Sequence, residues 1–219
     1  MTKSDCKVPE KINYKEYWNI AYQKTPTEKL GWFEEKSLKT IELIQQTQLP
    51  KDASILHVGA GTSTLIDDLI AEGYTNQIAN DLSEKSLVDL KNRLGADASK
   101  VTFLVDDLTN PTKLDKLAQV DLWNDRAVLH FFLTEAAQKA YFNLVKKLVK
   151  PNGFVLIAVF AIDGAEKCCG LPLQRYNETM LAESLGNDFS LITSFKYTFI
   201  NPFGGERPYV YTLFKRIDV

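Results

Sequence analysis

The sequence has few of the residues that build cross-linked or metal-stapled folds. Its 219 residues include three cysteines, Cys6, Cys168 and Cys169, and two histidines, His57 and His130. Three cysteines, two of them adjacent, cannot build a disulfide framework, and no Cys-x-x-Cys pair occurs. We therefore expect no structural zinc or other metal site, and a chain kept in a reducing compartment.

Long apolar runs and an excess of one charge are also missing. The longest apolar run, residues 154–162, is far shorter than the roughly 20 residues of a membrane helix, and residues 1–7 contain no apolar signal core. Lysine and arginine number 26 against 28 aspartates and glutamates, a net charge of −2. This balance argues against a general polyanion binder. We expect a soluble, cytoplasmic protein with neither a membrane nor a nucleic-acid partner.

The apolar pattern predicts alternating strands and helices. Strands are expected at 53–58, 77–80, 101–105, 120–123 and 154–161, and helices at 33–48, about 65–70, 83–94 and 134–149. Such alternation is typical of a parallel α/β sheet, and the nearly continuous apolar strand 154–161 belongs at its centre. After a helix at 177–185, strands 189–199 and 209–215 follow with no helix between them, which predicts an antiparallel hairpin. We expect one compact unit, with an N-terminal helical cap over residues 1–50 and an α/β domain over 51–219.

The sharpest signal is a glycine turn between the first strand and the helix after it. Gly59 and Gly61 allow the backbone to turn tightly and approach a ligand. Asp81 follows Gly59 by 22 residues, at the expected end of the second strand. An acid at about this spacing binds ribose hydroxyls in nucleoside-binding folds. The alternatives are a plain tight turn and, for Asp81, a helix cap near Ser83.

The remaining motif residues bear on which nucleoside is bound. A dinucleotide fold has a third glycine where this chain has Thr64, which weakens the case for a diphosphate ligand. S-adenosylmethionine has ribose and adenine but no phosphate. Asp106 and Asp107 follow the third strand, where a carboxylate can accept a hydrogen bond from the adenine amino group. We prefer Asp107, because it lies further past the apolar run.

With these elements in order, the chain resembles the class I S-adenosylmethionine-dependent methyltransferases from about Tyr14 to its C-terminus. The motif residues 55–63, Asp81, Asp107, 121–126 and 150–153 carry the resemblance. It implies a Rossmann-like seven-stranded, mostly parallel sheet with an antiparallel C-terminal hairpin and helices on both faces. It also implies S-adenosylmethionine as cofactor, held by Trp32, His57, Gly59, Ala60, Gly61, Ser63, Asp81, Leu82, Asp107, Leu108 and Asn124.

Two narrower resemblances do not fix the substrate. The pairs Tyr17-Trp18 and Trp32-Phe33, together with residues 121–132 and 166–172, are similar to those of a group of small bacterial methyltransferases. The pairs Tyr17-Trp18 and Trp32-Phe33 are also similar to the opening of some lysine methyltransferases that act on elongation factor.

One departure from the family is His57, which stands where the family commonly has an acid near the methionine end of the cofactor. His57 either replaces that acid by hydrogen bonding or packs in the core.

Methyl transfer from a sulfonium is an in-line displacement that mainly needs alignment of the acceptor. A base is needed only if the acceptor arrives protonated. The catalytic candidates are Asp125, Arg126 and His130, near the end of the fourth strand, with a structural ion pair and a packed histidine as the alternatives. The acceptor is a small molecule or a protein side chain. Other possibilities for the whole chain are a nucleotide-dependent oxidoreductase and a non-catalytic cofactor-binding protein.

The segment before the first strand is rich in aromatic residues. Tyr14, Tyr17, Trp18 and Tyr22 have helical spacing, and Trp32 follows a break at residues 25–27. We predict a lid over the cofactor in which Trp32 touches the ligand. The alternative is an aromatic helix packed permanently on the sheet.

Overall fold

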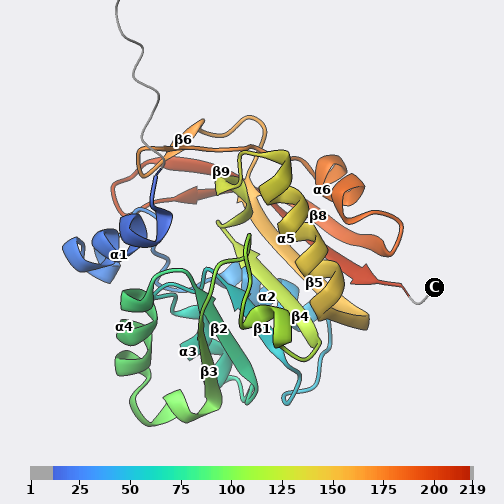
Figure 1. Ribbon diagram of the computed structural model, residues 1–219, viewed down its shortest axis with the longest axis horizontal. Coiled ribbons are helices and arrows are strands. Elements are labelled where there is room, and N and C mark those ends of the chain that lie inside the picture. The colour runs from blue at the N-terminus through green and yellow to red at the C-terminus, as the bar shows by residue number, and fades with distance from the viewer. Residues whose placement is uncertain (1–11, 218–219) are drawn as a thin grey trace, which may run out of the picture.

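The computed structural model describes residues 12–217 as a seven-stranded sheet with helices on both faces (Figure 1). The strand order is β3-β2-β1-β4-β5-β9-β8. The strands are β1 (Ile55–Val58), β2 (Gln77–Asp81), β3 (Val101–Val105), β4 (Val120–Arg126), β5 (Val149–Phe160), β8 (Phe189–Ile200) and β9 (Glu206–Arg216). β1 to β5 are parallel, whereas β9 runs antiparallel to both β5 and β8. The predicted fold class and its terminal hairpin are confirmed.

The helices begin where the sequence offers capping side chains. They are α1 (Tyr14–Lys24), α2 (Leu38–Gln46), α3 (Leu65–Ala71), α4 (Glu84–Leu94), α5 (Glu135–Leu148) and α6 (Glu178–Leu185), with 3-10 turns η1 (Thr27–Lys29), η2 (Gly95–Lys100), η3 (Leu114–Lys116) and η4 (Leu129–Phe131). Ser83, Thr134 and Asn177 each accept a hydrogen bond from a backbone N–H in the first turn of the following helix. Within residues 12–217, no helix has the length and apolar character needed to cross a membrane.

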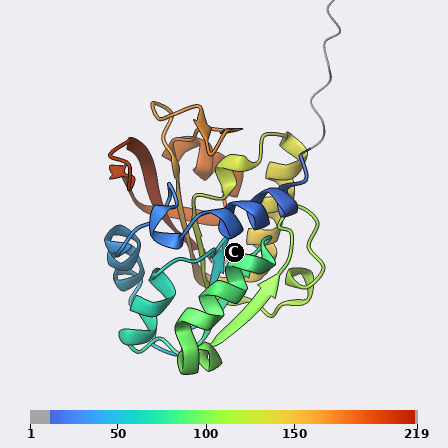
Figure 2. The ribbon, with the colours of Figure 1, turned by 90° about the vertical axis from the view of Figure 1, so that its left-hand side faces the viewer.

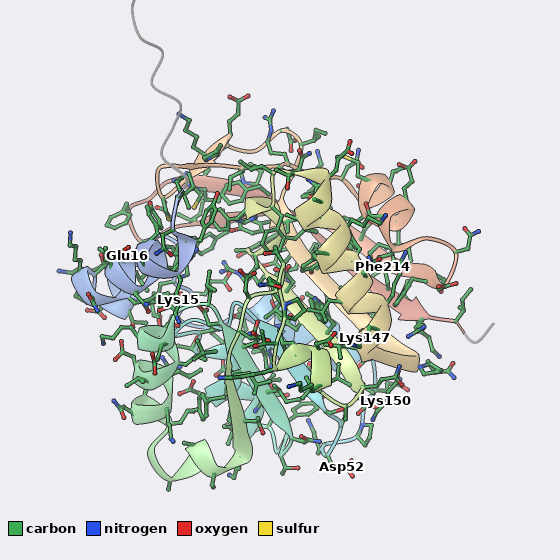
Figure 3. The ribbon with its side chains drawn as sticks, viewed as in Figure 1. Lys15, Glu16, Asp52, Lys147, Lys150 and Phe214 are labelled. Atoms are coloured by element: carbon green, nitrogen blue, oxygen red, sulfur yellow. The ribbon has the colours of Figure 1, made fainter. Side chains whose placement is uncertain are left out.

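The core lies on both faces of the central strand β5. Val155, Ile157 and Val159 pack beneath α5 and α6, and the alternate residues Leu156 and Ala158 pack beneath α2. All five side chains are fully buried. A parallel strand covered on both faces reads as a continuous apolar run, as the sequence predicted. Phe214 of β9, labelled in Figure 3, completes the layer beneath α5 and α6.

Three details differ from the sequence-based expectation. Helix α2 begins at Leu38 rather than at residue 33. Strand β5 begins at Val149 instead of 154, so the expected turn at 151–153 lies within the strand, where the pairing with β4 shifts register and Asn152 has a φ of 61°. A small ribbon, β6 (Lys167–Cys168) with β7 (Leu171–Pro172), has too few residues to leave a periodic signal.

Helix α1 lies across the edge of the sheet at which the parallel strands end, between α4 and the β6–β7 ribbon (Figure 2). The Tyr17 hydroxyl donates to the carbonyl of Cys169 in the ribbon. At α4, Oδ1 of Asn19 accepts from the Ser83 hydroxyl at 2.8 Å and from the Lys85 N–H at 3.2 Å. Helix α1 therefore bridges two distant parts of the chain above the strand ends.

Candidate functional site

Two adjoining cavities lie at the edge covered by α1. Their volumes are about 370 Å³ and about 60 Å³. Tyr22, Trp32, Gly59 and Arg126 line both, so these four residues form the boundary between the large and the small cavity.

The predicted residues divide between the two cavities. The small cavity is lined by Trp32, His57, Gly59, Ala60, Ser63, Asn124 and Arg126. The large cavity is lined by Trp32, Gly59, Asp81, Leu82, Asp107, Leu108, Arg126 and His130. The other two predicted residues, Gly61 and Asp125, line neither of these cavities.

The glycine turn needs glycine at both of its positions. Gly59 has a φ of 58° and Gly61 a φ of 53°, in the left-handed region that side chains disfavour. A Cβ on Gly59 would stand 2.1 Å from Cγ2 of Val128, and one on Gly61 would stand 2.3 Å from the Tyr22 hydroxyl. The turn is therefore held between α1 and the segment after β4.

Asp81, at the end of β2, is hydrogen-bonded to this turn. Its Oδ2 accepts from the Gly61 N–H at 2.8 Å, and its Oδ1 accepts from the Ser83 N–H at 2.7 Å. The side chain is 7% exposed, and burial raises its pKa to about 6 against the lowering effect of these hydrogen bonds. Asp81 thus accepts a hydrogen bond at the start of α4, which was the alternative role expected for it. It also lines the large cavity.

The two acids after β3 have different surroundings. Asp106 accepts from the backbone N–H groups of Thr112, Lys113 and Leu114, at 2.8 to 3.2 Å, which fixes the loop ahead of η3. Although burial acts to raise its pKa, these hydrogen bonds hold the pKa below its usual value. The Asp107 carboxylate accepts from the N–H and the hydroxyl of Thr109, both through Oδ1, and the Asp107 carbonyl accepts from the Asn110 N–H. Asp106 is thus the acid that holds a loop in place, whereas the Asp107 carboxylate bonds only within its own turn among residues 12–217.

His57 is the centre of a neutral hydrogen-bond chain beside the small cavity. Asn124 Nδ2 donates to His57 Nδ1 at 3.0 Å, so we assign the ring proton to Nε2, which donates to Gln77 Oε1 at 3.1 Å. Gln77 in turn donates to the Ile66 carbonyl. Burial lowers the pKa of His57 to about 4, which keeps the ring uncharged at pH 7. Oδ1 of Asn124 is buried and has no hydrogen-bond partner among the residues that the structure describes.

Arg126 forms an ion pair with a residue that the sequence analysis did not single out. Its Nη2 lies 2.9 Å from Oε1 of Glu34, and its Nη1 donates to the Trp32 carbonyl at 2.9 Å. The guanidinium also lies 4.9 Å and 5.5 Å from the ring centroids of Phe199 and Tyr209. Arg126 does form an ion pair, although its partner is Glu34 in the N-terminal segment rather than the neighbouring Asp125.

Asp125 has a structural setting. Its carboxylate is fully buried and accepts from the N–H groups of Val128 and Leu129 and from the Tyr141 hydroxyl. Burial raises its pKa to about 6. These contacts fix the turn after β4, and Asp125 itself lines neither of the two cavities.

His130 is the one predicted catalytic candidate that lines only the large cavity. It is fully buried among the rings of Phe131, Phe160 and Tyr209. Neither ring nitrogen has a hydrogen-bond partner within residues 12–217. Burial, aided by the charge of Arg126, lowers the pKa of His130 to about 3. The ring is therefore neutral at pH 7 and a weak base.

A family model described as a methyltransferase domain matches residues 56–155, which span β1 through most of β5. The matched domain, the relatives named as methyltransferases and the shared fold together indicate a class I S-adenosylmethionine-dependent methyltransferase. This methyltransferase is 28% identical over 170 residues to EEF1A lysine methyltransferase 2 of Danio rerio, covering 71% of this chain and 72% of the relative. Its cofactor is S-adenosylmethionine.

Solved structures share the fold. The 1,6-didemethyltoxoflavin-N1-methyltransferase of Burkholderia thailandensis has a TM-score of 0.65 at 24% identity, covering 84% of this chain and 80% of that one. A methyltransferase from Anabaena variabilis has a TM-score of 0.73 at 12% identity, covering 94% and 96%. At these identities the likeness concerns the fold alone.

The sequence analysis missed several residues that line the cavities. Tyr14, Trp18 and Tyr22 of α1 and Tyr209 of β9 line the large cavity, and Glu34 lines the small one. The aromatic spacing predicted α1 and a lid over the cofactor, but not which side chains of α1 would line a cavity. Trp32 does lie at the cavities, and Trp18 meets it edge to face with ring centroids 5.6 Å apart.

Proposed function

We propose that this methyltransferase transfers the methyl group to a primary amine, the side chain of a lysine in a protein substrate. Two observations support the proposal. The large cavity is lined by aromatic as well as acidic residues, and we call the part at Tyr14, Trp18, His130, Phe131 and Tyr209 the acceptor half. The curated relatives it matches are named as protein methyltransferases, and two of them as EEF1A lysine methyltransferases.

We further propose how the cofactor lies. Its adenosine part would occupy the large cavity, where Asp81 would accept from the ribose hydroxyls and Asp107 from the adenine amino group. Backbone N–H groups at Leu82 and Leu108 are the neighbouring donors. Gly61 would contribute through Asp81, to which its N–H already donates.

The methionine end would occupy the small cavity. Asn124 Oδ1, buried and unpartnered within residues 12–217, is an acceptor suited to an ammonium group. The Arg126–Glu34 pair supplies one charge of each sign, which suits a zwitterion. His57 would then act by orienting Asn124 rather than by replacing the missing acid itself. Trp32, at the boundary of the two cavities, would lie beside the sulfur.

The chemistry in the acceptor half needs alignment more than a strong base. The bound cofactor supplies a methyl group already activated by its positive sulfur. The aromatic walls exclude water, which favours the uncharged, nucleophilic form of an amine. Neutral His130 would accept a hydrogen bond from the amine N–H and so aim its lone pair, without removing a proton.

A small-molecule amine is the second candidate, and helix α1 is the observation that favours it. The helix is tied to the ribbon by Tyr17 and to α4 by Asn19, so it covers the acceptor half from above. A protein substrate would need α1 to move, whereas a small molecule would not.

We propose that residues 1–50, which include α1, act as a cap over the site and that residues 51–219 form the catalytic domain. Residues 1–11 and 218–219 lie outside the described structure.

The test uses methyl-labelled S-adenosylmethionine and a lysate of the source organism, separated afterwards into protein, nucleic acid and small molecules. We expect label in the protein fraction, released as methyllysine on hydrolysis. The control is the Asp107→Asn variant, which should transfer little. Label confined to small molecules would support the second candidate, and no transfer by a protein that binds the cofactor would contradict both.

A further inference from the structure

Cys168 and Cys169 form a pair of thiols at the rim of the large cavity. Their sulfur atoms are 3.5 Å apart, within sulfur hydrogen-bond distance. Cys168 lines the cavity, and both residues are half-buried rather than sealed in the core. Cys169 has a φ of 52° and Gly170 a φ of 76°, which make the tight turn of the β6–β7 ribbon. The turn thus holds the Cys168 thiol at the cavity and the Cys169 thiol next to the Cys168 sulfur.

The surroundings favour a thiolate at Cys168. The hydrogen bond from Cys169 lowers the pKa of the Cys168 thiol, and the charges of Arg207 and Arg126 lower it further, against the opposite effect of burial. The same hydrogen bond raises the pKa of Cys169, which remains the protonated donor. A partly exposed thiolate in a positive field is the reactive form of cysteine.

Backbone geometry disfavours a disulfide between the two. Adjacent Cα atoms across a trans peptide lie about 3.8 Å apart, whereas disulfide-bonded residues usually have Cα atoms at least about 4.4 Å apart. The described residues contain no cis peptide bond. The geometry therefore suits a Cys168 thiolate that accepts a hydrogen bond from the Cys169 thiol.

We propose that Cys168 is a site of reversible exchange with small-molecule disulfides, with Cys169 stabilising its thiolate. The Cys168 sulfur attacks one sulfur of the small disulfide, the disulfide bond breaks, and the other half leaves as a thiolate. Cys168 is oxidised to a mixed disulfide as that half is reduced, and excess thiol reverses the step. The group attached to Cys168 would stand at the large cavity, which Tyr209 and His130 also line. The inference is independent of the acceptor's identity.

The experiment treats the reduced full-length protein with oxidised glutathione at pH 7.5 and follows each cysteine by peptide mass spectrometry. We expect one glutathionyl group on Cys168, added about tenfold faster than to Cys6 of the same chain or to Cys168 in urea-unfolded protein. The Cys169→Ala variant should react about threefold or more slowly, because the thiolate loses its donor. Excess dithiothreitol should restore the unmodified mass.

An arginine pair provides the matched control. Arg207→Gln should slow the exchange about twofold, since Arg207 acts on both thiols, whereas Arg175→Gln, in the same region but paired with Glu166, should leave the rate unchanged. Three results would overturn the proposal: equal rates at Cys168 and Cys6, no effect of Cys169→Ala, or loss of two hydrogens through a Cys168–Cys169 disulfide. The first would mean that the folded surroundings do not activate Cys168.

Discussion

At the scale of single residues, some side chains that line the two cavities also make contacts that stabilise the fold. Asp81 ties the glycine turn to the start of α4, and Arg126 ties the end of β4 to the N-terminal segment through Glu34. The Asp107 carboxylate, by contrast, bonds among residues 12–217 only to Thr109, in its own turn. Substitutions of these acids should therefore have separable effects on binding and on stability.

Asp81→Asn and Asp107→Asn should each weaken the binding of S-adenosylhomocysteine by about 1.5–3 kcal/mol, the range for losing hydrogen bonds to a charged group. Only Asp81→Asn should also lower the melting temperature, because its new NH₂ group faces a backbone N–H of either Gly61 or Ser83. Calorimetry and thermal melting on both variants check this. An Asp81→Asn protein that melts lower but binds normally would limit Asp81 to its helix-start contact.

His57 makes stability depend on pH in a predictable direction. Its pKa is lowered from 6.5 to about 4 in the folded chain, so the unfolded chain binds more protons between those values. Its contribution to stability is therefore complete above pH 6.5 and is lost as the pH falls toward 4.

The His57→Gln variant removes this titration while keeping a donor and an acceptor for Gln77 and Asn124. The difference in unfolding free energy, wild type minus variant, should grow by roughly 3 kcal/mol from pH 4 to pH 7. Urea unfolding at four pH values measures it. A difference that stays constant across this range would show that His57 is not buried as a neutral ring.

Residue identities alone predicted part of this site. The spacing of Gly59, Asp81 and Asp107 was sufficient to bring them to one cavity, because they follow three neighbouring parallel strands, β1, β2 and β3. The partners of His57 and Arg126 could not be predicted, since Gln77, Asn124 and Glu34 meet them only after strand pairing and docking of the N-terminal segment.

At the scale of elements, the glycine turn and α1 are fitted to each other. A Cβ on Gly61 would lie 2.3 Å from the Tyr22 hydroxyl and 3.2 Å from the ring carbon that carries it. A change in the turn should therefore be partly relieved by a change in the helix.

Gly61→Ala should lose stability through both its positive φ and its clash with Tyr22. The double variant Gly61→Ala with Tyr22→Phe should recover part of the loss, because only the hydroxyl contact is removed and the backbone strain, about 1–2 kcal/mol, remains. Melting temperatures of the two single variants and the double variant test this. Strictly additive losses would mean that the turn and α1 do not contact one another in solution.

The lid prediction concerns α1 as a whole. The helix has no fully buried residue and is tied down at Tyr17 and Asn19, so it can loosen without unfolding the sheet. We expect amide hydrogen exchange in residues 14–24 to slow when S-adenosylhomocysteine is added, and Tyr17→Phe to raise exchange in the free protein. Equal protection with and without ligand would make α1 a permanent part of the core.

At the scale of the whole molecule, the alternation of strands and helices was enough to predict the sheet and its antiparallel end. Burial on both faces forces the apolar run of β5 into the centre, and the missing helix between β8 and β9 forces the hairpin. The cap was less predictable, because where α1 lies depends on contacts with α4 and the β6–β7 ribbon, far away in sequence. Two of the four residues at the boundary between the cavities, Tyr22 and Trp32, come from this N-terminal segment.

Calorimetric comparison of S-adenosylhomocysteine with 5′-methylthioadenosine tests the two-cavity site most directly. Methylthioadenosine has the adenosine part but no amino acid, so it can reach Asp81 and Asp107 but not the Arg126–Glu34 pair or Asn124. We predict that adenosylhomocysteine binds at least about tenfold more tightly, since about 1.4 kcal/mol suffices for that ratio and a charged hydrogen bond contributes as much. Asn124→Leu should reduce this ratio and leave methylthioadenosine binding unchanged. Equal affinities of the two ligands for the wild-type protein, or no heat from either at millimolar concentration, would contradict the account.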